Sequence, residues 1–105
     1  MAVSRARAEQ LTTKREFELL EKSWGRELSS LSPARLRQKI QRARAMRDKF
    51  RDLARQQAGE ARGKRDPRST RPAKSNQNTK LKSQIFDEAL SRFEERLVAL
   101  ETAGS

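Results

Sequence analysis

Apolar side chains recur every three or four positions in three stretches of the chain, which is the spacing of one face of an α-helix. The first stretch predicts a helix over residues 13–28, because Thr13 and Glu16 fit a capping box at its beginning. Gly25 either weakens this helix or ends it with a turn of the chain. The predicted apolar face consists of Phe17, Leu20, Trp24, Leu28 and Leu31.

The second stretch has the clearest beginning, since Ser32 can cap a helix and Pro33 suits its first position. No further glycine or proline follows until Gly59, so we expect one helix over residues 33–57. At ~1.5 Å per residue this helix is roughly 37 Å long. Gly59 and Gly63 then favour a helix stop. The apolar side of this helix consists of Leu36, Ile40, Ala43, Phe50, Leu53 and Ala54.

Residues 59–78 contain two Gly, two Pro and a cluster of Ser, Thr, Asn and Gln, which predicts a basic irregular loop. A third helix is expected over residues 79–101, with Asn76 or Asn78 as its cap. No segment alternates apolar and polar residues as a half-buried strand does. We therefore predict an all-α fold: a small three-helix bundle or a helical hairpin, with residues 1–105 forming a single helical domain that has a long Arg-rich second helix. The third apolar face consists of Phe86, Leu90, Phe93, Leu97 and Leu100.

The chain has 105 residues and contains no His, Cys or Tyr. This composition excludes zinc fingers, thiol nucleophiles, disulfides and imidazole bases. Asp48 and Asp52 are spaced i,i+4 and could hold a metal, but arginines three or four residues away are better placed to neutralise them. We therefore expect no catalytic residues, no metal, no cofactor and no enzymatic activity.

No apolar run approaches the ~20 residues that a membrane span needs. The first residues also lack the apolar core of a signal peptide. From these features we expect a soluble, cytoplasmic protein that does not enter a membrane.

The chain is strongly basic, with 25 Lys and Arg, 14 Asp and Glu, and a net charge of +11. Residues 32–57 carry nine of the cations and only two carboxylates. Arg37, Arg44, Arg51 and Arg55 share one direction of the predicted helix, and Arg47 lies beside its apolar edge. Guanidinium groups stay charged and bind phosphate in a bidentate manner, so this pattern favours a polyanion. The predicted loop contains six cations, of which five are further candidates for binding the same partner: Arg62, Lys64, Arg65, Arg68 and Arg71.

The leading hypothesis is a non-enzymatic protein that binds nucleic acid, DNA or RNA, mainly through the phosphate backbone. The alternative is a small inhibitor, antitoxin, immunity protein or secretion chaperone that covers an acidic or phosphate-binding surface of a partner protein. Trp24, beside Gly25, would then be a candidate anchor at the protein interface. Self-assembly into a homo-oligomer through the apolar faces is a third class. An interpretation without any specific ligand also stays open, in which the cations only keep an exposed helix face solvated and the loop is a linker.

Overall fold

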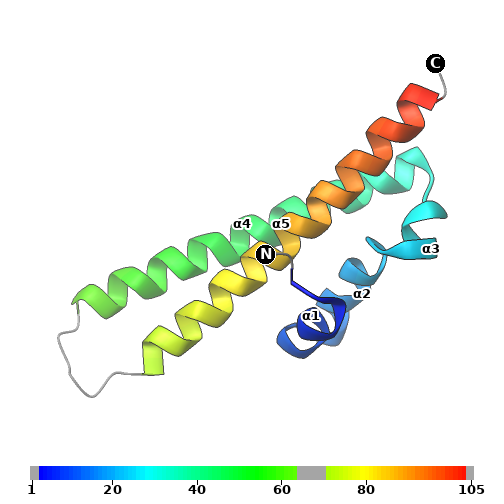
Figure 1. The fold of residues 1–105 in the computed structure, drawn as a ribbon. Coiled ribbons are helices and arrows are strands. Elements are labelled where there is room, and N and C mark those ends of the chain that lie inside the picture. The colour runs from blue at the N-terminus through cyan, green and yellow to red at the C-terminus, as the bar shows by residue number, and fades with distance from the viewer. Residues whose placement is uncertain (1–2, 64–70, 104–105) are drawn as a thin grey trace.

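A computed structural model describes residues 3–63 and 71–103, and every regular element within these ranges is a helix. Figure 1 shows the two longest helices lying side by side, with the short helices gathered against one side of the pair. The molecule is elongated, with extents of 58 × 24 × 23 Å. The described elements are α1 (Arg5–Leu11), α2 (Lys14–Glu21), α3 (Gly25–Ser29), α4 (Pro33–Gly63) and α5 (Arg71–Ala103).

The all-α prediction is confirmed within the described residues, and the three-helix bundle is not confirmed. Two long helices pack mainly against each other, and three short helices precede them in the chain. The short helices lie beside the half of the pair that contains the beginning of α4 and the end of α5 (Figure 1). The other half of the pair extends beyond them.

The two long helices run antiparallel, and bonds between them fix their register. Near the beginning of α4, Arg37 Nη2 donates to Glu101 Oε1 over 3.0 Å. Further along, Ser83 Oγ donates to the carbonyl oxygen of Arg47 over 3.2 Å. Close to that contact the rings of Phe50 and Phe86 stack with their centroids 5.7 Å apart.

The core lies where the short helices meet the long pair. Its buried side chains come from four of the five helices and from the segment before α4, and Phe86 and Phe93 are completely buried. Leu53 was expected on the apolar side but is 37% exposed. Leu53 lies on the same flank of α4 as Met46, two helical turns further along the helix. On this flank α2 lies against α4 at Met46. The core consists of Ala8, Leu19, Leu20, Leu31, Leu36, Ile40, Ala43, Phe50, Ile85, Phe86, Ala89, Leu90 and Phe93.

The helix expected over residues 13–28 is divided into α2 and α3. Its beginning is confirmed, because the Thr13 N–H donates to Glu16 Oε1 over 2.8 Å and the Glu16 N–H donates to Thr13 Oγ1 over 3.2 Å. Of the two expectations for Gly25, the turn is the one observed. Gly25 has a φ of +53°, a left-handed conformation that a residue with a Cβ adopts only at a cost.

The loop expected over residues 59–78 is wrong at both of its ends. Helix α4 continues to Gly63 and α5 begins at Arg71, so Asn76 and Asn78 lie inside a helix instead of capping one. Residues 64–70 of the predicted loop lie outside the described residues. A glycine in a helix costs only about 1 kcal/mol, and a proline is tolerated in the first turn. Packing of one long helix against the other can therefore outweigh these local preferences.

Candidate nucleic-acid interface

Helix α4 carries the predicted arginine stripe on one continuous backbone. Ser32 caps this helix by accepting from the Arg35 N–H over 3.3 Å, and no break interrupts the helix before Gly63. Residues seven apart on a helix repeat at roughly 10.5 Å along its axis. The four predicted stripe residues are all exposed, and they are Arg37, Arg44, Arg51 and Arg55.

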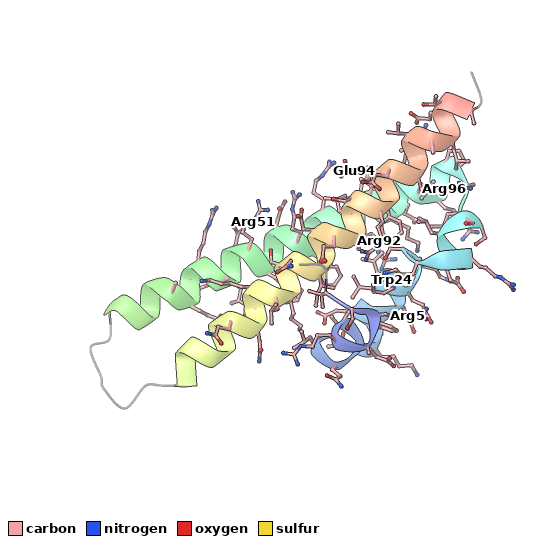
Figure 2. All side chains as sticks on the ribbon, in the orientation of Figure 1. Arg5, Trp24, Arg51, Arg92, Glu94 and Arg96 are labelled. Atoms are coloured by element: carbon pink, nitrogen blue, oxygen red, sulfur yellow. The ribbon has the colours of Figure 1, made fainter. Side chains whose placement is uncertain are left out.

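These exposed arginines differ in whether a carboxylate already neutralises them. Arg37 forms an exposed ion pair with Glu101, whose strength is at most about 1 kcal/mol. Among the described side chains, no carboxylate forms an ion pair with Arg44, Arg51 or Arg55. In Figure 2, Arg51 projects from α4 on the side away from the short helices. This part of the stripe is therefore accessible and not neutralised.

Arg47 has a different role from the one expected for it. Its side chain is only 20% exposed, with Nε 3.1 Å from Asp48 Oδ1 and Nη1 3.4 Å from Asp87 Oδ1. The hydrogen bond to Asp48, followed by the one to Asp87, raises the pKa of Arg47. Because Asp87 belongs to α5, Arg47 joins the two long helices and is not presented to a ligand.

A hollow of about 320 Å³ lies between the end of the stripe that contains Arg51 and Arg55 and the part of α5 around Lys80. Three of its lining residues are cations, Arg51 and Arg55 from α4 and Lys80 from α5, and none of the described lining residues is a carboxylate. The remaining lining residues are Ala54, Ala58 and Ser83, whose small side chains leave room between the cations. Such a hollow can accept an anionic group that contacts both long helices.

Lys80 is the interface residue that the sequence analysis missed. It lies 25 residues after Arg55, on a helix whose predicted beginning was almost at Lys80 itself. Only the antiparallel register of α4 and α5 brings it beside Arg51. No local signal in the sequence distinguishes Lys80 from the other exposed lysines.

At the beginning of the stripe, cations lie beside a carboxylate and apolar side chains. A second hollow, of about 370 Å³, is lined by Arg37 and Arg44 together with Glu94. Figure 2 shows Glu94 on α5. Its other lining residues include Ile40, Leu97 and Val98, which are apolar. The carboxylate weakens the attraction of this end for an anion, so the end of the stripe near Arg51 and Arg55 is the more favourable one.

The predicted loop cations lie only in part within the described residues. Arg62 is in the last turn of α4 and Arg71 is the first residue of α5, so both belong to helices. Lys64, Arg65 and Arg68 lie outside the described residues.

Trp24 lies between helices and is half-buried. The guanidinium carbon of Arg92 is 4.6 Å from the centre of its ring, and that of Arg5 is 5.8 Å away (Figure 2). Arg92 also donates from Nε and Nη2 to Ser23 Oγ, over 3.1 and 3.0 Å. Burial lowers the pKa of Arg92. These contacts attach the short helices to α5, and whether Trp24 also anchors a partner stays a prediction.

Comparisons with known proteins do not assign this arrangement. No protein family, curated protein or solved structure matches this chain. Within residues 3–63 and 71–103, no three carboxylates gather as metal ligands would. Over the same ranges, no helix has the length and apolar character needed to cross a membrane.

Proposed function

We propose that this protein binds nucleic acid through the phosphate backbone, without catalysing a reaction, and that Arg44, Arg51, Arg55 and Lys80 make the main contacts. The observation that supports this proposal is the hollow lined by Arg51, Arg55 and Lys80, whose described lining contains no carboxylate. Guanidinium groups match the geometry of phosphate oxygens and remain charged at every physiological pH. A phosphate in this hollow would be held from two helices at once.

The dimensions of the helix pair favour contact with the backbone over reading of bases. The cross-section of the molecule is 24 × 23 Å, whereas the major groove of a DNA duplex is about 12 Å wide. Because α4 is packed along α5, only its exposed arginine side can approach a duplex. The exposed stripe can instead lie across phosphates, a mode that carries little sequence preference.

Salt dependence of binding tests the proposal. The affinity for a labelled duplex would be measured by fluorescence anisotropy from low to physiological salt. Four phosphate contacts should give a slope near −3.6 in log K against log salt, because each contributes about −0.9. The Arg51→Gln/Arg55→Gln variant should then lose about 1.8 of that slope.

A matched control separates the stripe from net charge. Arg7 and Arg26 are also exposed but lie on α1 and α3, so Arg7→Gln/Arg26→Gln removes the same charge elsewhere. This control should keep the slope of the parent protein. If both double variants lose affinity equally, the stripe is not the interface. If neither a duplex nor a single strand binds at physiological salt, the proposal is wrong and a protein partner becomes the better hypothesis.

A further inference from the structure

A second basic hollow lies on the other flank of α4, against α2. Arg42 is nine residues before Arg51, which places it about half a turn around the helix at ~100° per residue. The hollow has a volume of about 360 Å³. Its lining contains four cations and one carboxylate, and consists of Arg15, Glu18, Leu19, Lys22, Lys39 and Arg42.

Lys39 is a half-buried cation in this hollow that other cations surround. Its side chain is half-buried, and among the described side chains no carboxylate forms an ion pair with it. Burial lowers the pKa of Lys39, and the charges of Arg42, Lys22 and Arg35 lower it further. Lys22 keeps one partner, since its Nζ lies 2.9 Å from Glu27 Oε2. An anion between these cations would relieve their repulsion.

An apolar hollow adjoins the basic one. It has a volume of about 270 Å³ and shares Arg15, Leu19 and Arg42 with its neighbour. Beside Leu19, its lining adds the apolar side chains Ala45 and Met46. It also contains Glu16, whose carboxylate is already paired with Lys82 of α5, Oε1 lying 3.2 Å from Nζ. The two hollows together fall within the range of roughly 300–1,000 Å³ that is usual for small-molecule sites. The surface between α2 and α4 therefore offers a cationic half and an apolar half side by side.

We propose that this paired hollow binds an organic phosphate of nucleotide size. Its phosphate groups would lie among Lys22, Lys39 and Arg42, and its ring would lie on Leu19 and Met46. A thioether makes favourable contacts with aromatic rings, which suits a flat base at that position. The ligand can be a free nucleotide or a nucleotide unit of a nucleic-acid strand, because both present the same phosphate and ring.

The experiment follows backbone amide resonances of the full chain during titration with ADP and, separately, with inorganic pyrophosphate. Both should shift resonances of α2 and α4, and ADP should bind more tightly because only ADP fills the apolar half. Arg42→Gln should weaken both by at least about tenfold, the effect of one charged hydrogen bond. Met46→Gln should weaken ADP alone. ADP should also raise the pKa of the Lys39 amine, which faces Arg42 and Lys22.

The control is Arg51→Gln/Arg55→Gln, which leaves this flank unchanged and should keep the affinity for ADP. If the control weakens ADP as much as Arg42→Gln does, binding is general charge attraction and the inference is wrong. It is also wrong if millimolar ADP shifts no resonance of α2 or α4. Loss of duplex binding in the control with ADP binding retained separates this site from the proposed function. The same control variant also identifies which ligand the hollow takes. If a single-stranded oligonucleotide displaces ADP from it, the ligand is a nucleotide unit of a strand; if the oligonucleotide does not displace ADP, the ligand is a free nucleotide.

Discussion

Replacing Phe93 by alanine should remove a large part of the stability of this protein. The ring has no exposed surface, and it lies in the core shared by the long helices and the short ones. Truncating a buried phenylalanine costs about 3–5 kcal/mol, because transfer energy is lost and a cavity remains. A chain of 105 residues has a total stability of roughly 5–15 kcal/mol. The melting temperature should accordingly fall by at least about 12 °C, at about 4 °C or more per kcal/mol.

Urea unfolding at 25 °C measures this loss with two probes. Circular dichroism reports on the helices, and fluorescence of Trp24, the single tryptophan, reports on the attachment of the short helices to α5. Val98→Ala is the matched control, because Val98 is on the same helix but 61% exposed, and its effect should stay within about 0.5 kcal/mol. If Phe93→Ala costs no more than Val98→Ala, the ring is not part of a packed core and the reasoning fails.

Two further predictions concern glycine geometry and pH. Gly59→Ala should raise the melting temperature, with a gain of about 0.5–1 kcal/mol in the free energy of unfolding, since Gly59 lies in a helix with open space around it. Gly25→Ala should lower the melting temperature because of the positive φ of Gly25. Shifts of the same sign in the two melts would contradict this. The pKa of Lys39 is lowered in the folded protein, so the unfolded chain holds the Lys39 proton more tightly. The charged amine therefore lowers the free energy of unfolding at neutral pH, and this loss of stability diminishes as the pH rises toward the usual pKa of about 10.5. Lys39→Met should therefore be more stable than the parent near pH 7. The difference between their urea midpoints should become smaller at higher pH, and a difference that stays constant would refute this prediction.

The beginnings of α2 and α4 could be predicted because capping chemistry is local. The Thr13 and Glu16 pair forms both of its reciprocal hydrogen bonds, and Ser32 caps α4 directly before Pro33. The buried faces could also be predicted, since a helical period places Phe86 and Phe93 on one side whatever lies opposite. These features depend on residues within one or two helical turns.

Features that depend on pairing of distant segments could not be predicted. The extension of α4 and α5 through residues 59–63 and 71–78 runs against local glycine, proline and asparagine signals, so short-range sequence patterns placed both helix ends wrongly. Arg47 was assigned to a ligand because Asp87, forty positions later, was not known to face it. Lys80 was overlooked for the same reason, since only the register places it beside Arg51.

The half of the helix pair beyond the short helices has a consequence for binding. Among the described side chains of residues 51–59 only Ala54 is buried, and among those of residues 77–84 only Thr79 is. Regions with little buried apolar surface open before the rest of a structure. Because Arg51, Arg55 and Lys80 lie in this half, a bound polyanion would hold the two helices together there and slow amide hydrogen exchange locally. The strength of binding would then depend on how often this end of the pair is closed, so that a substitution such as Ala54→Gly could weaken binding without removing a single charge.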